Sequence, residues 1–166
     1  MSEHDTGDEV DALVAAWQRE RSDLDLSPVE VFSRISRLAR RLDLARRAAF
    51  SAHGVEPWEF DVLAALRRAG DPYQLSPGAL LRETMVTSGT MTNRVDRLVE
   101  RDLVTRAPDP DDRRGVQVRL TSAGRRAVDG AFETLIARER DLLGQLGEDD
   151  REHLADLLRR LVVPLG

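Results

Sequence analysis

Three observations predict a chain that folds mainly as α-helices with one small β-hairpin. Apolar residues recur at helical spacing along most of the 166 residues. Two runs with the composition of strands, Leu103–Ala107 and Val116–Leu120, flank a turn rich in Pro, Asp and Gly. Two short helices, each with its own capping residue, precede this hairpin. The predicted fold class is therefore mainly α with a small β-wing, in which a winged helix-turn-helix lobe is combined with a helical dimerisation region.

The first part of the chain is expected to hold two helices after a disordered tail at residues 1–8. A capping box at Ser27–Glu30, with proline at the first helical position, predicts the start of a long helix that His53-Gly54 ends. One face of this long helix is apolar and holds Phe32, Ile35, Leu38, Leu42, Ala45 and Ala49. The spacing i, i+3, i+4, i+7 predicts a shorter amphipathic helix before it, over about 9–21, from Val10, Leu13, Val14 and Trp17.

Three more helices are predicted before the hairpin, over about 57–68, 78–84 and 88–101. Pro57, Ser76-Pro77 and Thr87 or Ser88 mark their starts. We assign to the core the inward residues Trp58, Val62 and Leu66 of the first, and Met91, Val95, Leu98 and Val99 of the third.

Two helices are expected after the hairpin. Thr121 caps one that extends to about Leu146, and the acidic run Glu148–Asp150 favours the start of the other through the helix dipole. The last helix carries a stripe of Leu154, Leu157, Leu158 and Leu161. Because the terminal helices have apolar stripes without evident partners, we expect a homodimer that buries them across a twofold axis. The expected domains are N-terminal helices at 9–56, a winged helix-turn-helix lobe at 57–121 and C-terminal dimerisation helices at 122–166.

The composition of the chain argues against several classes of function. No apolar run is long enough to span a bilayer, and the N-terminus is acidic rather than signal-like, so we expect no membrane partner. The absence of cysteine excludes disulfides and thiolate metal sites and fits a cytoplasmic protein. His4, His53 and His153 lie on unrelated segments, and no Ser-His-Asp order, phosphate loop or supported carboxylate pair occurs. We therefore expect no catalytic site, no metal and no cofactor.

The charge is unevenly distributed. The net charge is −5, but the stretch from Arg82 to Arg126 holds ten arginines and seven acidic residues. Binding to DNA responds to this local balance more than to the total charge. All 25 basic residues are arginine, which forms bidentate contacts with phosphate and guanine.

A helix-turn-helix followed by a charged hairpin is the pattern of a winged helix that binds DNA, with the second helix in the major groove. Short polar side chains gather at the start of that helix, and a solvated, capped helix face is the alternative explanation. Arg97 either reaches a phosphate or pairs with Asp96 or Glu100. The expected contacts from this helix are Ser88, Thr90, Thr92, Asn93, Arg94 and Arg97.

The hairpin turn supplies a second set of expected DNA contacts. Arg113 and Arg114 lie at its tip, where a flexible arginine suits a narrow minor groove; an ordinary charged turn is the alternative. The acidic run beside them does not suit calcium, because two arginines continue the loop and no glutamate closes it.

The segments Leu103–Arg106, Asp109–Gly115 and Val118–Gly124 resemble the MarR family of transcriptional regulators, and the resemblance covers about residues 28–165. It implies a dimeric winged-helix protein on a palindromic operator, usually a repressor that a small ligand releases. It also implies that Asp112 braces Arg114, which enters the groove.

The run Thr87–Arg94 and the extra N-terminal helix resemble the urate-responsive branch of that family. That resemblance implies urate or a related anionic purine as the effector. The ligand pocket and its relay would be formed by Trp17, Asp61, Arg94 and Arg106.

Other interpretations of these residues stay open. Asp61 has no helical neighbour able to pair with it, so it is either solvated or satisfied from another segment. Trp17 either packs in a helical stripe or stacks on a flat heterocycle. Two other functions remain: the same fold responding to a phenolic or other aromatic acid, and a winged helix used for protein–protein assembly.

Overall fold

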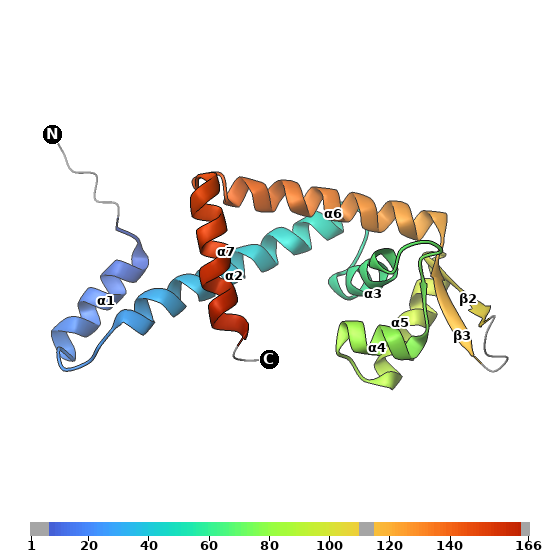
Figure 1. Cartoon of the computed structure of the whole chain (residues 1–166), viewed down its shortest axis with the longest axis horizontal. Coiled ribbons are helices and arrows are strands. Elements are labelled where there is room, and N and C mark those ends of the chain that lie inside the picture. Colours follow the sequence, from blue (N-terminus) through green and yellow to red (C-terminus); the bar gives the residue numbers. More distant parts are fainter. Residues whose placement is uncertain (1–6, 110–114, 164–166) are drawn as a thin grey trace. The chain divides into compact units, whose positions relative to one another are not determined.

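The computed structural model describes residues 7–109 and 115–163 (Figure 1). Its architecture is mainly helical with a small antiparallel sheet, which confirms the predicted fold class. Within these residues, none of the helices combines the length and the apolar character that a membrane span requires. The elements are α1 (Glu9–Glu20), α2 (Ser27–Ser51), α3 (Pro57–Arg68), β1 (Gln74–Leu75), α4 (Pro77–Thr84), α5 (Ser88–Glu100), β2 (Val104–Pro108), β3 (Val116–Leu120), α6 (Ser122–Leu142) and α7 (Glu148–Val162).

The chain divides into two compact units, Met1–Leu44 and Ala45–Gly166. The division falls inside α2, whereas the boundaries expected from the sequence follow residues 56 and 121. The division lies before residue 56 because Ala49 and Phe50, in the last turns of α2, are buried in the core of the second unit.

In the first unit, Asp8 caps α1 instead of belonging to a disordered tail. Its carboxylate accepts hydrogen bonds from the amides of Val10 (2.8 Å) and Asp11 (3.2 Å), and the Asp11 carboxylate accepts one from the Asp8 amide (2.6 Å). Arg34 on α2 pairs with Asp8 at 2.9 Å and with Asp11 at 2.6 Å. Residues 1–6, which make up most of the expected tail, lie outside the described residues.

The capping box expected at the start of α2 is wrong. Ser27 is itself the first helical residue, and both its amide and its hydroxyl donate to the carboxylate of Asp25 at 3.0 Å. The Glu30 amide bonds to the Leu26 carbonyl at 3.2 Å rather than to a serine hydroxyl. The carboxylate of Asp25 accepts two donors at once, so the helix begins one residue earlier than expected.

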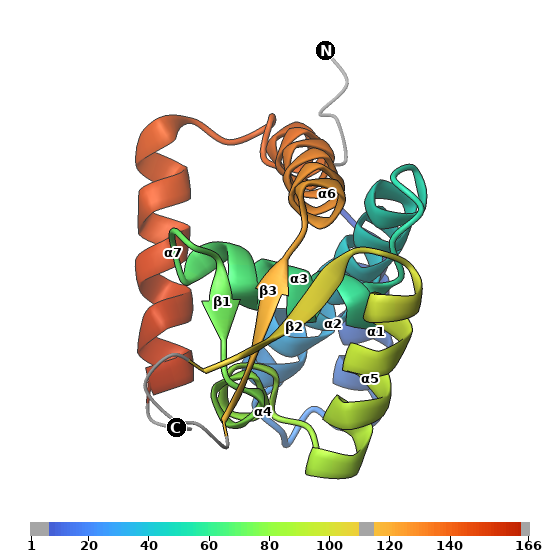
Figure 2. The same ribbon diagram turned by 90° about the vertical axis from the view of Figure 1, so that its right-hand side faces the viewer.

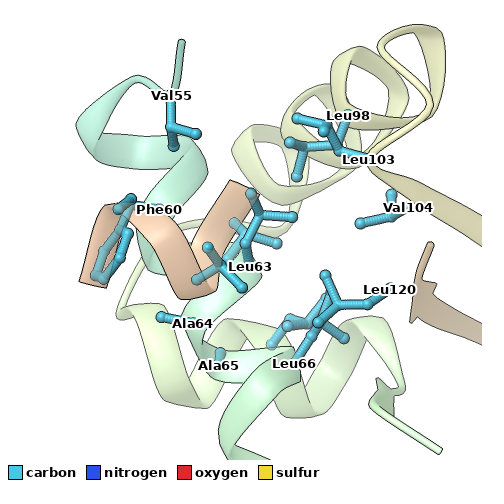
Figure 3. Close-up of a cluster of buried hydrophobic side chains, with 14 of the residues drawn as sticks. Val55, Phe60, Leu63, Ala64, Ala65, Leu66, Leu98, Leu103, Val104 and Leu120 are labelled. Atoms are coloured by element: carbon cyan, nitrogen blue, oxygen red, sulfur yellow. The ribbon is translucent and has the colours of Figure 1, made fainter. Parts of the chain in front are cut away.

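The core of the second unit lies between α3, α5, α6 and the sheet. Figure 3 shows Leu63 and Leu66 of α3 close to Leu98 of α5 and to side chains of β2 and β3. The strand order is β1-β3-β2, as Figure 2 shows, and Val104 pairs with Leu120 in the hairpin. Strand β1 was not expected from the sequence, because it has only two residues and so shows no alternation.

Two residues assigned to the core are not fully buried. Val99 is 38% exposed, because it lies one position beyond the buried stripe of Met91, Val95 and Leu98. Trp58 is half-buried and packs against the edge of the core.

The predicted cap of α6 is confirmed. The Thr121 hydroxyl accepts the Gly124 amide at 2.9 Å and donates to the Asp102 carbonyl at 2.7 Å. A Cβ atom at Gly124 would overlap the Leu103 carbonyl oxygen, so only glycine permits this approach of α6 to the strand.

Helix α7 is amphipathic but leaves most of its apolar side chains uncovered, with Leu154 half-buried. None of its described residues is buried, and Leu157, Leu158 and Leu161 of the expected stripe are exposed. The stripe is therefore free to meet another surface.

Candidate nucleic-acid interface

Helix α5 presents a polar surface at its N-terminal end. Thr87 precedes the helix, and its hydroxyl lies 2.9 Å from that of Thr90. The Thr92 hydroxyl donates to the Ser88 carbonyl at 3.1 Å, so this side chain is held close to the backbone. The opposite stripe of the helix is buried. The exposed expected contacts are Ser88, Thr90, Thr92, Asn93 and Arg97.

Two arginines of α5 lie against Trp58 at the start of α3. The guanidinium carbon of Arg97 is 4.8 Å from the centre of the Trp58 ring, and that of Arg94 is 5.7 Å away. Trp58, Arg94 and Arg97 line an open hollow of about 480 Å³ together with Gly89, Thr90 and Asn93. Pairing with Asp96 or Glu100, one of the two alternatives for Arg97, does not occur among the described residues.

The C-terminal end of α5 is attached to α3 by an ion pair. Arg101, where the helix ends, donates one guanidinium nitrogen to the carboxylate of Glu59 and another to the Gly54 carbonyl at 2.7 Å. The Glu59 side chain is only 1% exposed and also accepts the Glu56 amide at 2.9 Å.

A second ion pair joins α5 to the hairpin. Nη2 of Arg106 on β2 lies 2.6 Å from Oδ1 of Asp96 on α5. The side chains are 41% and 48% exposed, respectively, so solvent and small solutes reach both. The position of α5, the expected recognition helix, is therefore connected to β2, the first strand of the expected wing.

The described part of the hairpin is its base. The Asp109 amide donates to the Gly115 carbonyl at 2.9 Å, and the Gln117 side chain donates to the Asp109 carboxylate at 2.5 Å. The expected wing contacts Asp112, Arg113 and Arg114 lie outside the described residues. Their assignment stays a prediction.

The four residues of the expected ligand pocket are found in different surroundings. Trp17 lies on α1 and is 51% exposed. Asp61 is exposed on α3, and its side chain has no hydrogen bond or ion pair within residues 7–109 and 115–163. Arg106 reaches the recognition helix through Asp96, and no direct contact joins it to Arg94 in this part of the chain. The assignment of all four residues to one ligand pocket stays a prediction.

Three residues that hold α5 in place were not expected from the sequence: Glu59, Arg101, and Asp96 as the partner of Arg106. Glu59 had one local signal, because Glu56 and Glu59 form a capping box at the start of α3. The other pairs join separate segments and leave no short-range pattern. Within the described residues no group of three or more His, Cys, Asp or Glu side chains could hold a metal ion.

Comparison with known proteins finds similarity to one family of transcriptional regulators. A model of the MarR family matches residues 53–115. The HTH-type transcriptional regulator PecS of Dickeya dadantii is 37% identical over 153 residues, which cover 92% of each chain.

Two solved structures are also similar. A mutant of MarR from E. coli, complexed with operator DNA, is 26% identical with a TM-score of 0.66, covering 82% of this chain and 96% of that one. BpsR of Bordetella bronchiseptica is 28% identical with a TM-score of 0.57, covering 78% of this chain and 98% of that one. Its structure concerns the regulation of DNA binding by 6-hydroxynicotinic acid. These relatives are regulators and not enzymes, as the sequence predicts for this chain.

Proposed function

Because this chain belongs to the MarR family of DNA-binding transcriptional regulators, we propose that it is a repressor which a small anionic aromatic molecule releases from its operator. The observation that carries this proposal is the ion pair between Asp96 on α5 and Arg106 on β2. It gives an anion a direct way to act on the recognition helix.

The DNA-bound form is a homodimer on a palindromic operator. Its two copies of α5 enter successive major grooves, about 34 Å apart. The exposed apolar side chains of α6 and α7 support a partner surface, since Phe132 and Ile136 of α6 and three leucines of α7 are all more than a third exposed. The complex of a mutant of E. coli MarR with operator DNA supports the binding of operator DNA by this fold.

Release begins at Arg106. An anion that binds this guanidinium competes with Asp96, whose carboxylate is then left without its cation on the recognition helix. An unpaired carboxylate at this position repels DNA phosphates. The effector therefore prefers the DNA-free state, and this differential affinity is what any effector needs in order to shift the equilibrium.

Urate or a related anionic purine is the proposed effector. Arg106 would bind its charge, and Trp17 offers a half-exposed indole face for stacking on a flat heterocycle. The Asp61 carboxylate is exposed and unpaired among the described residues, so an anion placed beside it is repelled. Arg94 would pass the displacement to the recognition helix.

A phenolic or other aromatic acid is the second candidate effector. The hollow beside α5 supports it, because Trp58 supplies a flat ring while Arg94 and Arg97 supply positive charge. The effect of 6-hydroxynicotinic acid on BpsR points to the same class of molecule.

An operator gel shift tests the proposal. Specific binding to the protein's own promoter is expected, and urate is expected to abolish it at concentrations where Trp fluorescence titrates. The Trp58→Phe variant removes the background of the second indole. Release from the operator by aromatic acids but not by urate would show that the effector is the second candidate, a phenolic or other aromatic acid. No specific binding by the wild-type protein would favour a winged helix used for protein–protein assembly.

A further inference from the structure

Two arginines of α5 and the arginine that caps its C-terminal end contact the first turn of α3. Arg94, Arg97 and Arg101 are spaced by three and four residues, which places them on one face of the helix. Arg94 and Arg97 lie over the ring of Trp58, and Arg101 pairs with the next residue, Glu59. Two adjacent residues of α3 thus hold one face of α5 from its middle to its C-terminal end.

Glu59 differs from the other charged side chains of the described chain because it alone is buried. A buried carboxylate is stable only when a cation and hydrogen-bond donors satisfy it. Arg101 supplies the cation and the Glu56 amide supplies a further donor. The anchored end of α5 is therefore fixed in one place rather than free to slide.

The ion pair of Glu59 with Arg101 anchors the C-terminal end of α5, and this anchor also includes the corner between α2 and α3. Arg101 donates to the Gly54 carbonyl at 2.7 Å, and Gly54 lies between the two helices. Close by in the chain, Phe50 stacks on Phe60 with ring centres 4.0 Å apart. A displacement of this corner consequently acts on the C-terminal end of α5.

We propose that Glu59 is a positioning residue for DNA recognition, which sets the angle of α5 through Arg101. This role depends on DNA binding by α5, as in the proposed function, and is independent of the identity of the effector. Base-edge contacts require an accurate helix angle, whereas contacts to phosphates tolerate small rotations. Loss of the anchor is therefore expected to reduce discrimination between operator and unrelated DNA more than it reduces overall binding.

Two substitutions in the full-length protein separate positioning from folding. Glu59→Gln removes the charge but keeps an acceptor for the Glu56 amide. Glu59→Met replaces the carboxylate by an apolar side chain of similar volume, and the Arg101 guanidinium that loses its partner stays solvated, because its side chain is 44% exposed. The matched control is Asp129→Asn, which breaks the 2.7 Å ion pair between α3 and α6 without touching α5.

The measurements are the Kd for operator and for unrelated DNA at one salt concentration, with thermal unfolding of each variant. Both Glu59 variants are expected to lose operator affinity roughly tenfold, the scale of one misplaced base contact, with binding to unrelated DNA changed less than about twofold. Asp129→Asn is expected to keep the operator preference and to change the unfolding temperature little, because the ion pair that it breaks is partly exposed.

A folded Glu59 variant with the wild-type preference would overturn the inference, and so would an equal loss of preference in Asp129→Asn. Failure of the wild-type protein to bind its operator would instead refute the proposed function.

Discussion

The guanidinium of Arg106 on β2 lies 2.6 Å from the carboxylate of Asp96 on α5, so a single ion pair spans the recognition helix and the wing strand. Both side chains are partly exposed, and a pair of this kind contributes little to the stability of a fold. The ion pair instead affects the position of α5 relative to β2 and the charge on α5. It neutralises an acid on the recognition helix and holds the strand that leads to the wing.

Asp96→Asn is expected to make the protein less responsive to its effector. The amide no longer becomes a repulsive charge when Arg106 binds an anion, so effector-induced loss of operator affinity is expected to fall roughly tenfold, about 1.4 kcal/mol. The measurement is the operator Kd with and without urate. Glu100→Gln is the control, because it removes an equal charge from an exposed position on the same helix. Full release of Asp96→Asn by urate would contradict the proposed mechanism.

Arg114→Ala tests the wing assignment. Removing a groove-inserted arginine is expected to weaken operator binding by about 1–3 kcal/mol and to reduce the salt dependence by about one charge. Titrations of operator at several salt concentrations measure both. The assignment of Arg114 fails if its variant binds the operator as tightly as the wild type does.

Gly124→Ala is expected to destabilise the second unit. The new Cβ would overlap the Leu103 carbonyl oxygen, a backbone atom that cannot move aside alone. Overpacking of this kind costs about 1–3 kcal/mol, measurable by urea unfolding. Gly78→Ala is the control, since no atom lies closer than 4.0 Å to a Cβ there. Equal stability of the two variants would show that α6 adjusts without cost.

The attachment of α1 is expected to weaken in acid. The hydrogen bond from Arg34 is the main reason that the pKa of Asp8 lies below its ordinary value, and the capped amides of Val10 and Asp11 lower it further. A lowered pKa means that the stabilisation is complete above about pH 3.9 and is lost as the pH falls through the lower value.

An NMR titration of the Asp8 carboxyl and the Val10 amide measures this pKa directly. Asp8→Asn is the control, because asparagine still caps the helix but carries no charge. An Asp8 carboxyl that titrates at or above the ordinary value would contradict the expected contact with Arg34.

The elements that could be predicted from the sequence are those with local causes. The helix of Met91, Val95 and Leu98 follows from spacing, and the cap at Thr121 follows from residue type. The pairing of Glu59 with Arg101 spans 42 residues and depends on how α3 packs against α5, so no local pattern indicates it. The same holds for Asp96 and Arg106, whose pairing needs the strand to lie beside the helix.

The contacts of α5 with α3 have a consequence for how the protein searches DNA. Arg94 and Arg97 lie against Trp58 of α3 and Arg101 pairs with Glu59. Ser88, Thr90, Thr92 and Asn93 therefore form an uncharged patch at the start of the helix, with the exposed Arg97 beside it. A neutral surface releases few counterions when it meets DNA. We therefore expect ionic strength to alter how long the protein dwells on any DNA much more than it alters which sequence the protein prefers.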